Sequence, residues 1–138
     1  MKLLNLSELE IGYFVALKLR ESAPCMARVL NINGIDDVDF ELSNEYMVEY
    51  RSGNVEQIVA IPLTINWLSS LGFVRHFQKP NFFGLPIGGF LIEVEASTDG
   101  LIDKISVCEN GVKYEKRYDY VHEMQQEISH LNLIVEYE

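Results

Sequence analysis

The sequence has few basic residues for its length. Its 138 residues include 11 Lys and Arg against 21 Asp and Glu, which gives a formal net charge of −10 at pH 7. General binding to phosphate backbones needs clustered cations that displace counterions. The composition therefore argues against a general phosphate-binding protein, and it favours a solvated acidic surface or a basic protein partner.

Long apolar runs and cysteine motifs are also absent from the sequence. No stretch approaches the roughly 20 apolar residues of a membrane span, and the N-terminus lacks the apolar run of a signal peptide. The two cysteines, Cys25 and Cys108, fit no spaced metal or redox motif. We therefore expect a cytoplasmic protein with no membrane segment and two small buried thiols, with a disulfide between them left open.

The first sixty residues predict a β-rich part. Short apolar runs alternate with polar residues there, and Val38, Phe40 and Leu42 occupy every second position. The pair Asn33-Gly34 before them is the strongest short hairpin signal. About five strands joined by tight turns predict a small SH3-like barrel or a curled antiparallel sheet.

A short capped helix is predicted after this part. Pro62 ends the last strand, Thr64 is placed to cap the helix, and Gly72 is placed to end it. At a period of 3.6 residues its apolar side chains share one side: Ile65, Trp67, Leu68 and Leu71. A helix of barely two turns persists only when it packs this side on a sheet.

An antiparallel β-meander of three or four strands is predicted next. Residues 82–89 carry Gly84, Pro86, Gly88 and Gly89 and are interpreted as a loop. No G-K-[ST] follows these glycines, so they predict no phosphate site. Two later turns are expected, at Asp99-Gly100 and at Asn110-Gly111.

The last helix is predicted over residues 119–131. Its apolar stripe comprises Val121, Met124, Ile128 and Leu131. Residues 133–137 are interpreted as a short strand or an ordered tail. The fold class is therefore α+β, with a β-rich part over residues 1–60 and an α+β part over residues 61–138. Either part alone would have a marginal core, so we expect one compact unit in which they share an interface.

Two separated segments resemble those of a known family. They read I-P-L-T-I-N-W-L-S-S-L-G-F over residues 61–73 and Y-V-H-E-M-Q-Q over residues 120–126. They are similar to the I-P-L-T-x-x-W-L-x-x-x-G-F and Y-V-H-x-L-Q segments of an uncharacterised family of small proteins of gut bacterial genomes and mobile elements. The resemblance implies a helix, a few strands and a longer last helix. That family has no established activity.

No catalytic, cofactor-binding or metal-binding set is visible in the sequence. The pair His122-Glu123 begins like a zinc-protease motif, but the second His would fall at Gln126, and His130 lies eight residues from His122. These three polar residues are predicted to face water, opposite the apolar stripe. His76 has no partner at a meaningful spacing. We therefore expect no enzyme, no metal and no cofactor.

The candidate partner surface has an apolar and an acidic component. The apolar residues belong to the predicted loop and form a sticky patch if exposed, or part of the core if they close over the sheet. The acidic residues alternate with apolar ones, which favours a half-exposed strand over a calcium loop. The surface comprises Phe82, Phe83, Leu85, Ile87, Asp37, Asp39 and Glu41.

The sequence thus predicts a non-enzymatic accessory or protein-interaction protein with an acidic surface and a protein partner. The resemblance implies that a mobile element carries it. The alternative is a module that binds single-stranded nucleic acid through the N-terminal part, although the net charge argues against nucleic acid. That site would combine aromatic and basic residues: Tyr13, Phe14, Tyr46, Tyr50, Lys18, Arg20, Arg28 and Arg51.

Overall fold

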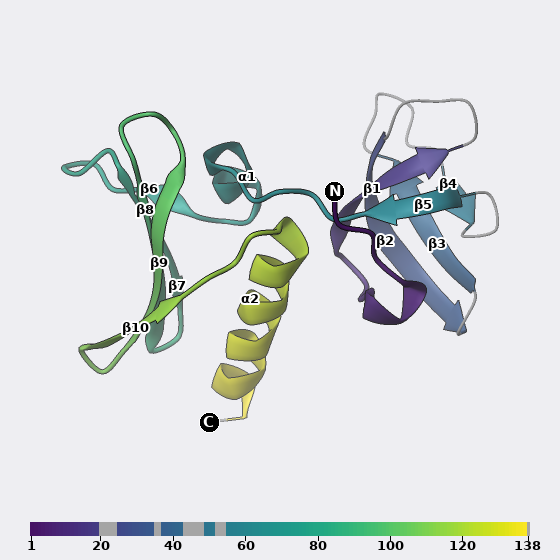
Figure 1. Cartoon of the computed structure of the whole chain (residues 1–138). Helices are drawn as coiled ribbons and strands as arrows, with labels where there is room; N and C mark the ends of the chain where they lie inside the picture. The colour runs from purple at the N-terminus through teal and green to yellow at the C-terminus, as the bar shows by residue number, and fades with distance from the viewer. Residues whose placement is uncertain (20–24, 35–36, 43–48, 52–54, 138) are drawn as a thin grey trace. The chain divides into compact units, whose positions relative to one another are not determined.

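The chain folds into two antiparallel sheets with two α-helices. The computed structural model describes residues 1–19, 25–34, 37–42, 49–51 and 55–137. The first unit comprises Met1–Ile61 with Tyr120–His122, and the second comprises Pro62–Asp119 with Glu123–Glu138. Each unit has its own sheet and its own core. The predicted α+β class with a β-rich N-terminal part is confirmed (Figure 1).

The first unit is built on one five-stranded antiparallel sheet. A 3₁₀ turn, Leu6–Glu8, precedes its strands, which are β1 (Phe14–Leu19), β2 (Cys25–Gly34), β3 (Asp37–Leu42), β4 (Glu49–Arg51) and β5 (Val55–Val59). Their order is β4-β3-β2-β1-β5. β4 and β5 therefore lie at opposite edges, and no pairing joins them in the described part of the chain. The sheet is open rather than a closed barrel.

The alternation in β3 places its apolar side chains in the core of the first unit. Val38, Phe40 and Leu42 are buried, and the acidic residues between them are not. Phe40 lies opposite Val29 of β2. Because side chains alternate between the two faces of a strand, one face is covered and the other carries charge. This prediction is confirmed.

The hairpin between β2 and β3 forms, but Asn33-Gly34 is not its turn. Asn33 and Gly34 belong to β2, and Gly34 lies opposite Asp37. Neither has the positive φ that a type I′ turn requires. The Asn33 amide instead donates a hydrogen bond of 3.0 Å to the Asp39 carboxylate on β3. This cross-strand bond is consistent with strand pairing through Asn33.

The second unit has a five-stranded sheet with both α-helices on one face. Its elements are α1 (Ile65–Ser70), β6 (Val74–Arg75), β7 (Phe82–Ile87), β8 (Phe90–Ala96), β9 (Ile102–Glu109), β10 (Val112–Lys116) and α2 (Val121–Glu136). The strand order is β10-β9-β8-β7-β6. Leu68 of α1 and Met124 of α2 share one core with Ile92 and Val107 of the sheet. The opposite face of this sheet carries no helix (Figure 1).

Helix α1 ends as its sequence predicts. The Phe73 amide donates to the Leu68 carbonyl at 2.9 Å, the Gly72 amide donates to Ser69 at 3.1 Å, and Gly72 has φ +98°. This pair of bonds is the Schellman motif. Thr64 occupies the N-cap position, but its side chain makes no capping hydrogen bond. Trp67 is only half-buried, so the helix docks chiefly through Leu68.

Residues 82–89 form a strand and a tight turn, so the predicted loop is wrong. Phe82–Ile87 pairs with β8 along its whole length, and Gly88 has φ +56° as the first residue of the two-residue turn. A glycine there is typical of a type II′ turn. Pro86 is tolerated because β6 pairs only with Phe83 and Gly84, so no β6 residue pairs alongside it.

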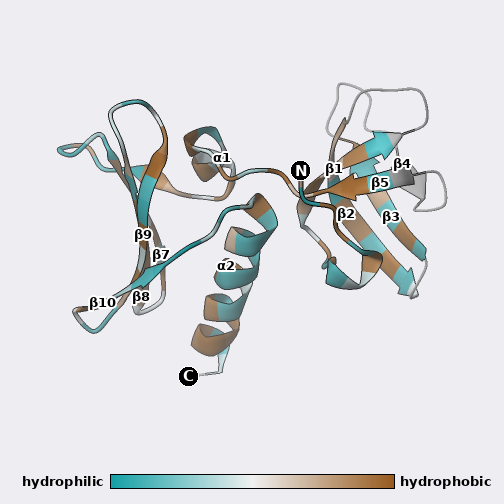
Figure 2. Ribbon diagram, in the orientation of Figure 1, coloured by the Kyte–Doolittle hydropathy of each residue, from teal (hydrophilic) through white to brown (hydrophobic). Residues whose placement is uncertain are grey.

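Helix α2 is longer than predicted. It continues to Glu136, so residues 133–136 are helical rather than a strand or tail. Val135 follows Leu131 by four residues and packs against the same core, which extends the apolar stripe by one turn. Figure 2 shows the resulting apolar and polar bands along the helix.

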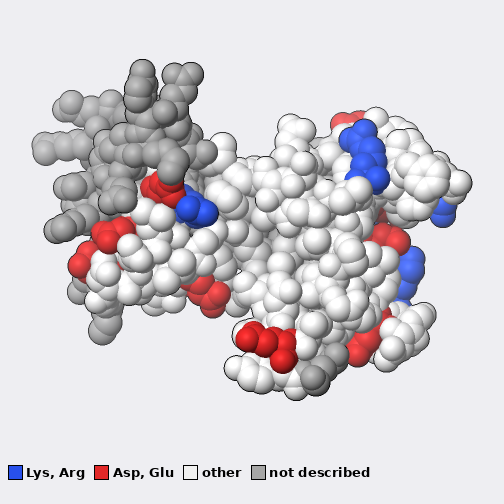
Figure 3. Space-filling view, turned by 180° about the vertical axis from the view of Figure 1, so that it is seen from behind, with Lys and Arg blue, Asp and Glu red and all other residues white. Residues whose placement is uncertain are grey.

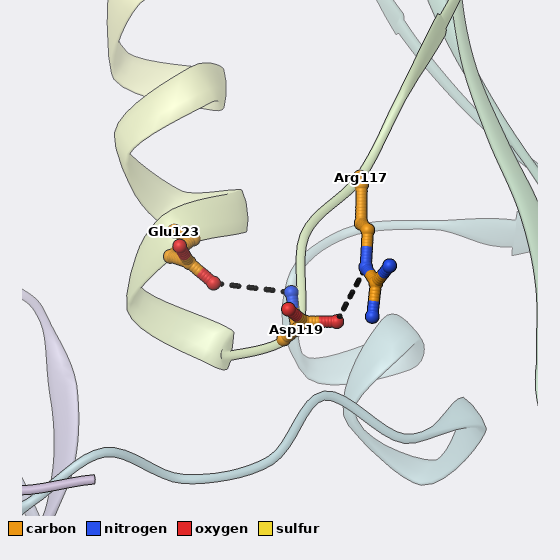
Figure 4. A network of polar contacts seen from close by, with 3 residues as sticks. All are labelled: Arg117, Asp119 and Glu123. Carbon is orange, nitrogen blue, oxygen red and sulfur yellow. Dashed lines mark hydrogen bonds and ion pairs between the residues drawn. The ribbon is translucent and has the colours of Figure 1, made fainter.

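Polar contacts fix the start of α2 (Figure 4). The Asp119 amide donates to Glu123 Oε1 at 3.0 Å, and Arg117 Nε donates to Asp119 Oδ1 at 3.2 Å. The Glu123 carboxylate lies in the first turn, where the helix dipole favours negative charge. These contacts join the segment that follows β10 to the helix.

Candidate functional site

The predicted apolar patch is divided between two faces of the second sheet. Phe83 and Ile87 are buried in the core, and Leu85 packs against them from the same face. Phe82 is half-buried and alternates onto the opposite, helix-free face. The structure therefore brings only Phe82 of this set to the open face of the sheet.

The predicted acidic residues lie together on β3 in the first unit. Asp37 is exposed, Asp39 accepts the bond from Asn33, and Glu41 Oε2 forms an ion pair of 2.8 Å with Arg28. Among the described residues, no group of three or more His, Cys, Asp or Glu is placed to hold a metal ion. On the face shown in Figure 3, acidic side chains form small separate groups among uncharged ones.

The aromatic and basic residues of the alternative site are only partly described. Tyr13 is buried and Phe14 is half-buried. Arg28 is balanced by Glu41. Arg20 and Tyr46 lie outside the described residues, as do the side chains of Tyr50 and Arg51. Within the described part of this site, Arg28 is therefore engaged and Tyr13 lies in the core.

The prediction that His122 faces water is wrong, whereas Gln126 and His130 are exposed as predicted. The His122 ring lies 6.0 Å from the ring of Tyr13 and 6.0 Å from that of Tyr120. Residues 120–122 belong to the first unit, so the helical wheel of α2 does not describe the first turn. Periodicity alone carried no signal of this.

His76 has a structural task at the end of β6. Its Nδ1 accepts hydrogen bonds from the amides of Gln78 and Lys79, both at 3.1 Å. The imidazole stacks on Phe77 with ring centroids 5.6 Å apart. Because the Nδ1 lone pair is engaged, the ring orders the turn between β6 and β7 and presents Phe77 beside it.

The open face of the second sheet holds two adjoining hollows, which we call the open-face groove. One encloses about 360 Å³ and the other about 430 Å³, and they share His76, Phe82 and Glu93. The first is further lined by Lys79, Glu95, Lys104, Ser106 and Lys113. The second is further lined by Val74, Arg75, Phe77, Phe83, Gly84 and Leu91.

One end of the groove is apolar and exposed. Val74 is 69% exposed, Phe77 is 88% exposed, and Leu91 lies at the margin of exposure. Gly84 forms the floor between them, where an added Cβ would lie 3.4 Å from Leu91 Cδ1. Leu91 therefore covers Gly84 and is one of the apolar side chains that this end presents.

The other end of the groove is charged. Lys113 Nζ lies 3.0 Å from Glu93 Oε1, and this hydrogen bond and charge raise the pKa of Lys113. Lys104 lies opposite Glu95 in the strand register. Lys79 Nζ lies 5.3 Å from the Phe82 ring centroid, a cation–π distance. Charge of both signs thus flanks the apolar end.

Sequence reasoning missed most of this groove, although one signal of it was available. In β8 the outward positions are Leu91, Glu93 and Glu95, and the inward ones include Ile92 and Val94. An apolar residue in an otherwise charged outward series indicates a contact on that face. The sequence alone could not show that residues 74–79 line the groove, because this depends on which strands become neighbours in the sheet.

Comparison of the chain with protein-family models, with curated proteins and with solved structures found no match. No helix in the described residues is both long and apolar enough to cross a membrane.

Proposed function

We propose that the protein is a non-enzymatic protein-interaction protein that binds a partner protein through the open-face groove. The observation that carries this proposal is the exposure of Val74, Phe77 and Leu91 beside Phe82 on one face of one sheet. Binding a partner protein removes such apolar side chains from water, which lowers the free energy of the complex. A partner that covers this face of the sheet would bury all of them together.

The polar groups of the groove favour binding over chemistry. A general base needs a free lone pair within reach of a proton, and His76 Nδ1 already accepts two backbone hydrogen bonds. Lys113 is held by Glu93, which keeps it charged and unsuited to nucleophilic attack. These groups can position a partner without reacting with it.

An accessory role in a bacterial cytoplasm fits the resemblance to small proteins of mobile elements. The net charge of −10 also suits a protein that stays soluble while it presents an apolar groove. We place the partner surface on the second unit rather than on the acidic residues of β3, because Glu41 and Asp39 are already engaged within the first unit.

Site-specific photo-crosslinking tests this function. A photoreactive phenylalanine analogue replaces Phe77 in one sample and Tyr137 in the control, because both side chains are highly exposed and both lie in the second unit. In cells of the source organism, we expect one identified protein to crosslink from position 77 and not from position 137. That protein is then purified and its affinity for the Leu91→Ser variant measured.

The expected result is a loss of affinity of about tenfold in Leu91→Ser, since a lost buried apolar side chain costs roughly 1.5–3 kcal/mol. Equal crosslinking from both positions would contradict the proposal. So would a captured protein that binds Leu91→Ser as tightly as it binds the wild type.

A further inference from the structure

We infer that the open-face groove takes an extended peptide segment of the partner, with an apolar side chain at one end and a carboxylate three or four residues away. This inference rests on the proposed function and adds the chemistry of the partner. It draws on the arrangement of apolar and basic groups across the strands of the second sheet.

The strand order sets the spacing between the two ends of the groove. The apolar end lies on β6, β7 and β8, around Gly84, and the basic end lies on β9 and β10, at Lys104 and Lys113. Neighbouring strands are about 4.8 Å apart, so β7 lies roughly 10 Å from β9 and about 14 Å from β10. An extended peptide advances about 3.3 Å per residue. Three or four residues therefore cover the distance.

The charged residues of the groove indicate that the second contact residue of the peptide is acidic. The charged end of the groove gathers three cations, Lys79, Lys104 and Lys113, with two carboxylates, Glu93 and Glu95. The whole chain has only 11 cations against 21 acidic residues. Because Lys113 is paired with Glu93, Lys79 and Lys104 are the cations best placed to meet a partner carboxylate. Complementary charge of this kind favours an acidic segment.

A peptide fits this face better than a nucleic acid does. Glu93 and Glu95 lie on β8, the central strand, where a chain of phosphates crossing the sheet would meet them. A peptide needs to place only one carboxylate and can keep it on the β9 side. Its apolar side chain would pack against Val74, Phe77 and Leu91.

Selection from a phage-displayed library of random ten-residue peptides tests the inference. The full-length protein is the bait, and Leu91→Ser, which removes an apolar side chain of the apolar end, is the counterselection. We expect the enriched peptides to share an aromatic or aliphatic residue three or four positions from an Asp or Glu. Enrichment without an acidic residue would overturn the inference and leave the proposed function standing.

Fluorescence anisotropy with the tightest-binding labelled peptide then tests whether its carboxylate contacts Lys104. Changing its acidic residue to the amide should weaken binding about tenfold, and Lys104→Gln should weaken it by a similar factor. The two changes together should cost little more than either one, since both remove the same contact. Lys116→Gln is the matched control, because Lys116 is exposed on β10 but does not line the groove. If the peptide change and Lys104→Gln weaken binding additively, the carboxylate does not contact Lys104.

Two further outcomes separate this inference from the proposed function. If position 77 captures a partner but no peptide is enriched, the groove binds a folded surface and the inference is wrong. If neither experiment yields a partner, both proposals fall. A labelled thymidine dodecamer is tested alongside: binding that is lost in Phe82→Ala would assign the face to single-stranded nucleic acid instead.

Discussion

Among the glycines that the structure describes, an added Cβ would make its closest contact at Gly88. Its φ of +56° is unfavourable for alanine, and a Cβ there would lie 2.5 Å from Val135 Cγ2. We predict that Gly88→Ala destabilises the second unit by about 3 kcal/mol, which sums backbone strain and steric overlap. Urea unfolding followed by Trp67 fluorescence measures this, because Trp67 is the single tryptophan and lies in this unit.

Two variants separate the strain from the overlap. Gly100 has φ +85° with nothing within 4 Å of an added Cβ, so Gly100→Ala should cost only about 1 kcal/mol. Val135→Ala in the Gly88→Ala background removes the overlapping methyl groups and should recover part of the loss. Equal costs for Gly88→Ala and Gly100→Ala would show that the end of α2 does not pack on this turn.

Tyr13 gives the first unit a predictable dependence on alkaline pH. Burial, followed by the charge and hydrogen bond of Glu10, raises the pKa of Tyr13 from 10.0 to about 12. Since the unfolded chain releases this proton first, stability is fully present below pH 10 and falls as the pH rises towards 12. Tyr13→Phe should remove this part of the slope, which amounts to about 2 kcal/mol.

The comparison is made between wild type and Tyr13→Phe by urea unfolding at pH 9 and at pH 11.5, followed by circular dichroism. Glu10→Ala should give an intermediate slope, because it removes the charge and the hydrogen bond of Glu10 and leaves burial in place. A wild-type slope that Tyr13→Phe leaves unchanged would mean that the phenol ionises without unfolding the first unit.

Helix α2 is attached to the second sheet through a narrow stripe of its surface. Met124 is fully buried, whereas Ile134 on the same helix is 37% exposed. We predict that Met124→Ala costs about 3 kcal/mol, since it leaves a cavity in the core. Ile134→Ala should cost less than about 1 kcal/mol. Urea unfolding followed by Trp67 measures both, and similar values would contradict the docking described here.

Elements with a full local pattern could be predicted from the sequence. The alternation of β3 and the glycine that ends α1 are set by neighbouring residues, and both are observed. Residues 82–87 were interpreted as a loop because Pro86 and Gly84 weaken strand propensity. Pairing with β8 overrides that propensity, and the short β6 leaves Pro86 without a partner on its other side. Such tertiary compensation has no local signature.

The candidate site depends even more on neighbours that only the fold supplies. Phe82 was identified from the sequence as a partner residue, but Lys104 and Lys113 join it only through the order of β7, β8, β9 and β10. Their positions in the sequence are more than twenty residues away from Phe82. The apolar end could be predicted in part, from the outward position of Leu91, and the basic end could not.

Because the chain divides into two units, its stability depends on whether each unit is stable by itself or is stabilised by the other. Each unit has between roughly sixty and eighty residues, a size at which a hydrophobic core gives only a small margin of stability. The sequence-based expectation of a shared interface follows from that margin and stays a prediction. If it is correct, weakening the core of the first unit should also weaken the second.

Val29→Ala tests this coupling, since Val29 is buried in the first unit and Trp67 reports on the second. We predict that Val29→Ala lowers the urea midpoint seen by Trp67 fluorescence, because a partner that unfolds earlier stops stabilising its neighbour. Met26→Ala is the control, as Met26 lies in the same strand but is 47% exposed. An unchanged Trp67 midpoint, with circular dichroism recording an earlier loss of the first unit, would mean that each unit owes its stability to its own core.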